Sequence, residues 1–467
     1  MTTTSKNDAR THQTDMTRGK PIRLILRFSL PLLFGNLFQQ LYNTVDSVIV
    51  GNFVGKHALA AVGVGFPFMF ALVSFFLGIG MATTILISQS YGAHDTDRVR
   101  LIAGTIYRVL SLSILPLMLL GFFLARPVLT LMNVPNDGTL DMAVSYLQII
   151  FLGIFGMIGY NLNAGLLQGV GDSVTSVRFL ILAAVTNIVL DLIFVIPLGM
   201  GVAGAALATS ISEILSWILG LIYINRHYTF FRIRLLHLPF DRVIFREALR
   251  LGIPSAIQNT VFSFGIIAMN SLINTFGTDF IAGFNGANKI DTFIFMPIQS
   301  FANAVTTYTG QNVGAANLER IHEGRRAGMI VSIAGTIVTG LLLYPLSGYA
   351  IALFNSDPGV VEVGVWYLHS VLPAYPLLAI LFVQNSILRG VGKAMAAMIT
   401  SLIALWFARV PAAYWIAATF GKQYIFLSYA IGWAIGCIVS YYFYHRGSWH
   451  DTVRAGGTLN QYKSADE

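Results

Sequence analysis

The first long apolar stretch of the chain is LILRFSLPLLFGNLFQQLYNTVDSVIV, at residues 24–50. A stretch of this length can cross a bilayer as a helix, because the hydrocarbon core requires about 20 mostly apolar residues. Similar stretches recur along the 467 residues, of which 55% are hydrophobic and only 11% are charged. Soluble domains have roughly 25% charged residues. The composition therefore excludes a soluble globular protein and predicts a helical membrane protein with many spans.

Other structural classes fail on composition or pattern. The chain has 33 Phe, 19 Tyr and long aliphatic runs, which excludes intrinsic disorder, and its single cysteine, Cys437, excludes a disulfide scaffold. A transmembrane β-barrel would alternate apolar and polar residues in short segments, and this sequence does not. The expected fold class is an all-α membrane protein.

Hydropathy predicts twelve transmembrane helices, joined by short polar segments. We expect residues 1–20 to be a solvated tail, because they contain no apolar core of a secretory signal. The expected spans are 24–50, 59–88, 101–125, 143–168, 177–198, 203–225, 249–275, 280–309, 327–353, 364–388, 395–418 and 423–445.

The chain also repeats itself at a shift of about 222 residues, which contains six of the twelve spans. An even number of spans gives both halves the same orientation, so the repeat is parallel and the two six-helix lobes are pseudo-symmetric. The predicted parts are a tail at 1–21, an N-terminal lobe at 22–225, a linker at 226–248, a C-terminal lobe at 249–446 and a tail at 447–467. The matching segments are Leu30-Pro31 with Ile253-Pro254, Gln89 to Arg98 with Gln311 to Arg320, and Leu167 to Gly171 with Leu388 to Gly392.

The distribution of positive charge predicts the orientation. Most of the 29 Lys and Arg residues lie on the side that carries both termini and the linker. Because such residues accumulate in cytoplasmic loops, we expect the tails and the linker to be cytoplasmic. This asymmetry accounts for the net charge of +8 without a nucleic-acid partner. The opposite side has Lys56, Arg126 and Lys422, whereas Arg108, Lys289 and Arg409 fall within spans.

Five segments together form a recognisable pattern: LYNTVDSVIVG at 41–51, QSYGA at 89–93, LQGVGD at 167–172, NIVLD at 187–191 and GVAGAALAT at 201–209. With the duplicated motifs, they resemble the multidrug and toxic compound extrusion (MATE) family over nearly the whole chain. The resemblance implies a two-lobe antiporter that expels organic cations and other amphipathic compounds in exchange for inward H⁺ or Na⁺.

The resemblance also implies a cation site in the N-terminal lobe, at positions that match Asp46, Asn187, Asp191 and Thr209. The residues themselves agree with this assignment. Asn187 and Asp191 are four apart and so share one face of a helix, and carboxylate and amide oxygens suit Na⁺, H⁺ or a hydrated ion. The alternative is that the two aspartates only form hydrogen bonds with neighbouring helices. Pro31 favours a bend in the first span, which is either static or, as is proposed for similar transporters, linked to protonation.

A polar stripe runs along the first span, where Asn36, Gln39, Asn43 and Asp46 are spaced by three, four and three residues. An ionisable group within the membrane is costly unless it is paired or faces water. The carboxylate therefore favours a stripe that lines the substrate cavity, and the alternative is a face that packs against other helices. In the sixth span, Glu213 is expected to support neighbouring site residues or to lie at the lipid interface.

The C-terminal lobe departs from the pattern of other branches of the family, which have an acidic residue in the seventh span. Here that span offers amides, and the repeat partner of Asp46 is Met269. The lobe instead has Asp291 and Arg409, which we expect either to form a structural ion pair or to contact substrate. Lys289 and Arg409 are the expected buried cations, and Lys289 and Arg108 could extend toward the membrane surface. The predicted substrate cavity comprises Asn36, Gln39, Asn43, Asn259, Asn270, Asp291 and Arg409.

These observations favour secondary active multidrug efflux in the cytoplasmic membrane of a bacterium or archaeon. We expect a monomer that needs no metal or other cofactor, only H⁺ or Na⁺ as coupling ion. The alternative is a flippase of lipid-linked oligosaccharides from the wider superfamily, which would need a cationic cavity. An enzyme is not expected, because no nucleophile, base or metal-ligand cluster is present in the sequence. The sequence also contains no recognisable selectivity filter of a channel.

Overall fold

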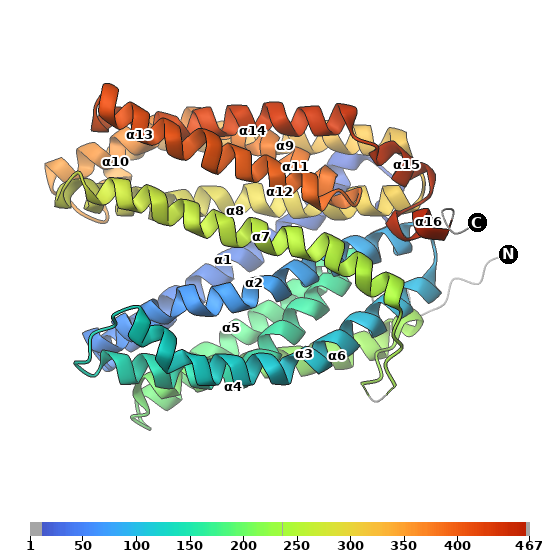
Figure 1. The fold of residues 1–467 in the computed structure, drawn as a ribbon, viewed down its shortest axis with the longest axis horizontal. Coiled ribbons are helices and arrows are strands. Elements are labelled where there is room, and N and C mark those ends of the chain that lie inside the picture. The colour runs from blue at the N-terminus through green and yellow to red at the C-terminus, as the bar shows by residue number, and fades with distance from the viewer. Residues whose placement is uncertain (1–11, 236, 464–467) are drawn as a thin grey trace. The chain divides into compact units, whose positions relative to one another are not determined.

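The computed structural model describes residues 12–235 and 237–463, and all regular structure in these two ranges is helical (Figure 1). The first half of the chain contains α1 (Pro21–Phe53), α2 (Lys56–Gly92), α3 (Thr96–Leu131), α4 (Thr139–Gly169), α5 (Ser173–Val195), α6 (Gly201–His227) and the 3₁₀ turn η2 (Thr229–Phe231). The second half contains α7 (Arg242–Asn274), α8 (Thr278–Gly314), α9 (Leu318–Ala352), α10 (Pro358–Val371), η3 (Leu372–Ala374), α11 (Tyr375–Gly390), α12 (Ala394–Leu402), η4 (Ile403–Arg409), α13 (Val410–Thr419), η5 (Lys422–Tyr424), α14 (Leu427–Arg446), α15 (Trp449–Arg454) and α16 (Thr458–Lys463).

Each predicted span corresponds to one long helical segment, and three spans in the second half are composite. The 3₁₀ turn η3 joins α10 to α11, the π-helix η4 joins α12 to α13, and η5 leads into α14. Within the described ranges, eleven segments are long and apolar enough to cross a membrane. The remaining one is α8, whose first half includes Asp279, Lys289 and Asp291. The predicted all-α, twelve-span fold is confirmed.

The two halves have the same local geometry, as the sequence repeat predicts. Helices α2 and α8 begin and end at positions exactly 222 residues apart. Residues with positive φ recur at the same shift: Gly55 and Gly277 at the start of these helices, and His94 and Ala316 after their ends. Asp95 and Asn317 then cap α3 and α9, each accepting a hydrogen bond from the backbone N–H three residues later.

The described chain divides into two compact units, whose boundaries fall inside helices. The first unit comprises residues 1–15 and 34–256, and the second comprises residues 16–33 and 257–467. The first turns of α1 therefore belong to the second unit, and those of α7 belong to the first. These units do not test the lobe boundaries that the sequence predicts, so the lobes at 22–225 and 249–446 stay a prediction.

The first unit is organised by close packing of α4 against α6. Gly153, Gly156 and Gly159 line one face of α4, and a Cβ at each would meet α6 atoms at 2.3–2.5 Å. Small residues at this spacing let two helix backbones approach closely. The α6 residues that these glycines contact are Ser210, Ile214 and Trp217. Thr209 and Glu213 lie on a different face of the same helix, and α5 packs on α6 as well.

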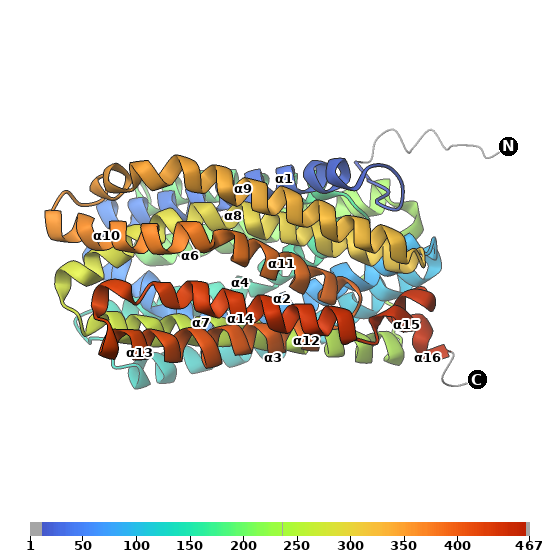
Figure 2. The ribbon, with the colours of Figure 1, turned by 90° about the horizontal axis from the view of Figure 1, so that it is seen from above.

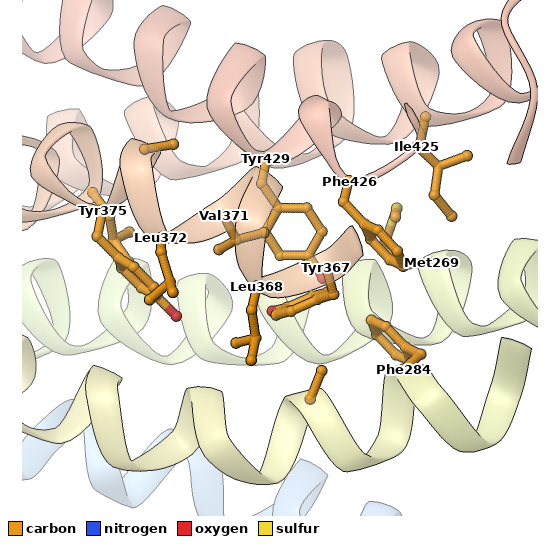
Figure 3. Packing of buried hydrophobic residues seen from close by; sticks show 14 of the residues in the cluster. Met269, Phe284, Tyr367, Leu368, Val371, Leu372, Tyr375, Ile425, Phe426 and Tyr429 are labelled. Carbon is orange, nitrogen blue, oxygen red and sulfur yellow. The ribbon is translucent and has the colours of Figure 1, made fainter. Parts of the chain in front are cut away.

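The second unit has an aromatic core between α8, α10 and α14 (Figure 3). The Tyr367 ring meets the Phe284 and Phe426 rings at centroid distances of 5.6 and 5.0 Å. Met269 of α7 is only 1% exposed in this cluster. The position that repeats Asp46 is thus part of an apolar core. Around the core, α8, α9, α10, α11 and α14 lie side by side as long rods (Figure 2).

The predicted solvated tail is wrong at Met16, whose side chain is fully buried. The Met16 N–H donates to Gln311 Oε1 (2.8 Å), and its carbonyl accepts from Asn312 Nδ2 and Arg320 Nη2, each at 3.1 Å. Arg320 Nη2 also donates to the Gly19 carbonyl. Residues 1–11 of this tail lie outside the described part. These bonds attach residues 16–19, which we call the N-terminal strap, to the last turn of α8 and the first turn of α9.

The other polar segments also contain packed structure. In the predicted linker, the Tyr228 hydroxyl donates to Asp172 Oδ2 (2.5 Å), while Asp172 Oδ1 caps α5 by accepting from the Thr175 N–H. Burial and the neighbouring Asp172 carboxylate raise the pKa of Tyr228 well above its usual value, so it stays a donor at physiological pH. In the predicted C-terminal tail, Trp449 of α15 is 1% exposed.

Candidate functional site

The two N-lobe aspartates that the sequence singles out lie together in the first unit. Asp46 lies on the second half of α1 and Asp191 lies on α5, and their carboxyl groups are within hydrogen-bond distance of each other. Elsewhere on the same two helices, Gly35 of α1 leaves room for Val177 and Leu180 of α5. Residues 145 positions apart in the chain thus form a pair of carboxyl groups.

Asn187 and Thr209 complete the predicted set. In the orientation that satisfies both ends of its amide, Asn187 Nδ2 donates to Asp191 Oδ2 (3.2 Å), and Oδ1 faces the Thr209 hydroxyl and backbone N–H, each at 3.3 Å. The Thr209 hydroxyl also lies 3.1 Å from the carbonyl of Ala205, one turn earlier on α6. The structure therefore connects all four predicted residues in one chain of contacts across three helices.

The oxygens of this cluster are incompletely satisfied. In the described part of the protein, neither Asp46 Oδ1 nor Asp191 Oδ1 has a hydrogen-bond partner, although both atoms are buried. Buried polar atoms are nearly always paired, so each exception needs an explanation. A proton or a monovalent cation between the two carboxyl groups would satisfy these oxygens and relieve the repulsion between like charges. The arrangement can therefore exchange a small cation.

A further carboxyl group lies beside this cluster. Glu213 of α6 has a buried Oε2 without a partner among the described residues. The Glu213 carboxyl group interacts electrostatically with the hydroxyl groups of Tyr42 on α1 and Tyr160 on α4. Tyr42 interacts in the same way with Asp46 and Asp191, so it links Glu213 to the cluster. The expected lipid-facing alternative for Glu213 is therefore wrong. Glu213 is four residues from Thr209, and this spacing is the sequence signal that could have placed both on one face.

The sequence is similar to known proteins over most of its length. A family model described as MatE matches residues 31–193 and 254–415. The probable multidrug resistance protein YpnP of Bacillus subtilis (strain 168) is 31% identical over 439 residues, covering 93% of this chain and 97% of YpnP. The chain belongs to the MATE family. Its two matched ranges in the family model coincide with the two copies of the repeat.

Solved MATE structures have the same fold. Crystal structures described as MATE in the bent conformation and MATE in the straight conformation each give a TM-score of 0.87 at 24% identity. Both cover 95% of this chain, and the chain covers 98% and 99% of theirs. The protein is thus a multi-pass membrane transporter of the MATE fold.

Two of the four residues of the polar stripe of this MATE protein are not packed between helices. Gln39 and Asn43 are exposed, and Asn36 and Asp46 are half-buried. The helix-packing alternative therefore does not hold for Gln39 and Asn43. Pro31 lies in the part of α1 that belongs to the second unit, and α1 is continuous through it.

In the second unit, the predicted cavity residues come from three segments, α7, α8 and η4. Asn259 is exposed and Asn270 is half-buried, both on α7. Asp291 of α8 interacts with the Tyr367 hydroxyl, which contacts Tyr429 in turn.

The expected Asp291–Arg409 ion pair is absent as a direct contact. Among the ion pairs of the described residues, none joins these two side chains within 4.0 Å, although they interact electrostatically. Arg409 instead lies over the Tyr429 ring, with its guanidinium carbon 3.2 Å from the ring centroid. Asp291 interacts with Tyr367, and the Tyr367 ring lies 5.5 Å from the Tyr429 ring.

The expected set of buried cations also needs correction. Lys289 is exposed, with its ammonium 5.4 Å from the Phe354 ring centroid, and Arg108 reaches the Leu238 carbonyl at 3.3 Å. Arg409 is buried as expected, but the second buried arginine is Arg389, which was assigned to the cytoplasmic side. Its position in the motif Leu388-Arg389-Gly390, where the first repeat has Gln168, is the only sequence signal.

Proposed function

We propose that the protein is a secondary active multidrug efflux antiporter that exports organic cations or other amphipathic compounds in exchange for inward H⁺ or Na⁺. The contact between the Asp46 and Asp191 carboxyl groups, each with a buried unpartnered oxygen, is the observation that carries this proposal. The name of the relative YpnP, a probable multidrug resistance protein, supports drug efflux. We place it in the cytoplasmic membrane of a bacterium or archaeon, as a monomer with cytoplasmic termini.

The coupling follows from competition for one pair of carboxyl groups. An empty, doubly ionised pair is strained by like-charge repulsion, so it favours uptake of a proton, of Na⁺ or of a cationic drug. A ligand that binds one conformation better than the other shifts the population toward that conformation. If the drug and the coupling ion favour opposite conformations, each is carried in one direction, as alternating access requires.

Helix α1 is the element that we propose to respond to the ion. Asp46 lies on its second half, in the first unit, while Pro31 lies three residues before the point where α1 passes from one unit to the other. A proline within a helix removes one backbone hydrogen bond and lowers the cost of bending. Two solved relatives are described as bent and straight conformations. Binding at Asp46 would bias the bend near Pro31.

The test is ethidium efflux in everted membrane vesicles under an imposed pH gradient or an imposed Na⁺ gradient. Asp46→Asn and Asp191→Asn keep the side-chain size and remove the exchangeable charge, so each should abolish gradient-driven efflux. Thr209→Ala should reduce efflux less, because water can replace a hydroxyl ligand. The matched control is Asp141→Asn, because Asp141 is an exposed aspartate that pairs with Arg126 outside the cluster. Wild-type efflux by either cluster variant would contradict the proposal.

A further inference from the structure

The second unit contains a cavity that none of the functional roles above uses. Its volume is about 70 Å³, and it lies between α7, α11, α12, η4 and α14. Since one water molecule takes about 30 Å³ of liquid, the space suits a group of carboxylate size with a water molecule. Its polar lining includes Arg389, Arg409, Ser401, Asn385 and Gln258.

Both arginines at this cavity are buried and neither forms a direct ion pair among the described residues: Arg409 interacts with Asp291 without direct contact, and Arg389 has no acidic neighbour. Arg389 is 8% exposed and Arg409 is 9% exposed, and no ion pair among the described residues includes either one. The Nε atom of each guanidinium is buried without a hydrogen-bond partner. Arg389 Nη2 donates only to Ser386 on its own helix, at 3.3 Å. A buried charge without a counter-charge is strongly unfavourable, so an anion in the cavity would be stabilising.

Ser401 adds a third donor. Its hydroxyl oxygen accepts from Gln258 Nε2 (2.6 Å) and from Asn385 Nδ2 (3.3 Å). Because a hydroxyl has two acceptor positions and one proton, its O–H remains available to donate. Asn385 Oδ1 is the one buried acceptor in this group without a donor, and a bound water would satisfy it. The polar lining is therefore mostly a set of donors that lacks an acceptor.

The position of Arg409 is fixed by the fold. It ends the π-helix η4, a widened turn of the kind that recurs at functional sites. Gly432 and Gly436 of α14 allow η4 to pack closely, since a Cβ at Gly432 would meet the Ala404 carbonyl oxygen at 2.7 Å and Arg409 Cβ at 2.8 Å. The Tyr429 ring holds the guanidinium by stacking.

The rest of the lining is apolar and aromatic. Phe262, Phe382 and Trp433 border the cavity, and Phe262 is 43% exposed. A ligand with a carboxylate in the cavity could therefore place an aromatic body against Phe262. Arginine pairs well with carboxylates, because its planar N–H groups match their two oxygens.

We propose that this cavity, which we call the arginine pocket, binds the carboxylate group of anionic or zwitterionic aromatic compounds. The proposal rests on the proposed efflux function in naming a class of transported compound, but binding itself can be measured without transport. It also gives the two units opposite electrostatics: a carboxyl cluster in the first and an arginine pocket in the second.

The experiment measures binding to the purified full-length protein in detergent by isothermal titration calorimetry. The probes are 2-naphthoate and its neutral analogue 2-naphthamide, which differ in charge but hardly in shape. We expect naphthoate to bind at least about tenfold more tightly than naphthamide, because only naphthoate forms a charge-assisted hydrogen bond with the pocket. Arg389→Gln and Ser401→Ala should each weaken naphthoate binding and leave naphthamide binding unchanged. Arg454→Gln, at an exposed arginine outside the cavity, is the control.

Ser401→Ala keeps both charges and the packing, so it remains informative if Arg389→Gln fails to fold. Equal binding of the two probes, or naphthoate binding that both variants leave intact, would overturn the proposal. Displacement of naphthoate by millimolar inorganic phosphate or by phosphatidylglycerol in the micelle, at concentrations where acetate has no effect, would assign the pocket to phosphate groups and overturn it too. Ethidium efflux in vesicles is measured in parallel. If the wild-type protein does not export ethidium, the proposed efflux function is contradicted, and the naphthoate titrations still test the arginine pocket by themselves.

Discussion

At the scale of single residues, the repeat places unlike side chains in equivalent positions. Asp46 has a partly buried carboxyl group in contact with Asp191, while its counterpart Met269 is packed in an aromatic core. Gln168 in the first copy of the repeat is neutral, whereas the equivalent residue in the second copy, Arg389, is a buried cation. Because the backbones of the two copies agree, these substitutions change the chemistry of a unit without changing its fold.

Asp172 shows how one residue can support two structures. It is fully buried, and its two oxygens accept from the α5 backbone and from Tyr228. Tyr228→Phe should lower the free energy of unfolding by roughly 1–3 kcal/mol, because a buried carboxylate oxygen loses its donor. Thermal unfolding in detergent checks this, with Tyr441→Phe at an exposed position as control. A Tyr228→Phe protein as stable as wild type would mean that water replaces the hydroxyl.

At the scale of elements, tight contacts at glycine set helix geometry. Gly432→Ala should destabilise the protein by roughly 1–3 kcal/mol, because the added methyl group would overlap the backbone of η4 and the side chain of Arg409. Gly348→Ala in α9 is the control, since a Cβ there would lie 4.0 Å from Val365 Cγ2, an ordinary van der Waals distance. There alanine should be neutral or slightly stabilising, as expected from helix propensity. Thermal unfolding of both variants distinguishes the steric effect of the added methyl group at Gly432 from the general effect of alanine on helix stability at Gly348.

The N-terminal strap is a second element whose attachment can be tested. Arg320 donates to the carbonyls of Met16 and Gly19, so Arg320→Gln should loosen the strap. Trypsin cleaves after Arg and Lys, and Arg18 and Lys20 lie in or beside the strap. We expect cleavage there to be several times faster in Arg320→Gln than in wild type, as amino-terminal sequencing of fragments would show. Arg326→Gln, at an exposed position on the same helix, should cleave at the wild-type rate.

At the scale of the whole molecule, the charge distribution predicts a topology with both termini and the linker in the cytoplasm. Arg234 is exposed in the connection between η2 and α7, so Arg234→Cys should react with an impermeant maleimide only in permeabilised cells. Lys422→Cys, on the predicted outer side, should react in intact cells. The half-buried Cys437 is first replaced by serine to remove background labelling. Ready labelling of Arg234→Cys in intact cells would reverse the orientation.

The sequence by itself determined the helical membrane class, the twelve spans, the parallel repeat and the family. These properties depend on composition and on local or periodic patterns, such as the hydropathy of residues 24–50 and the duplicated Gly-Val-Gly turns. The grouping of Asp46, Asn187, Asp191 and Thr209 was also predicted, because the family resemblance covers those motifs, and the structure brings the four side chains together.

Only the tertiary structure decided which polar groups are buried and what they touch. Arg389 follows an apolar run at a helix end, and nothing in its neighbours indicates that α12 and α14 cover it. Met16 lies in a polar segment and is buried because Gln311, Asn312 and Arg320, some 300 residues away, bind its backbone. Asp291 and Arg409 do not pair directly: Arg409 stacks on Tyr429 of α14, and Asp291 interacts with Tyr367 of α10. Burial and pairing depend on contacts between distant segments, and those contacts exist only once the helices have packed.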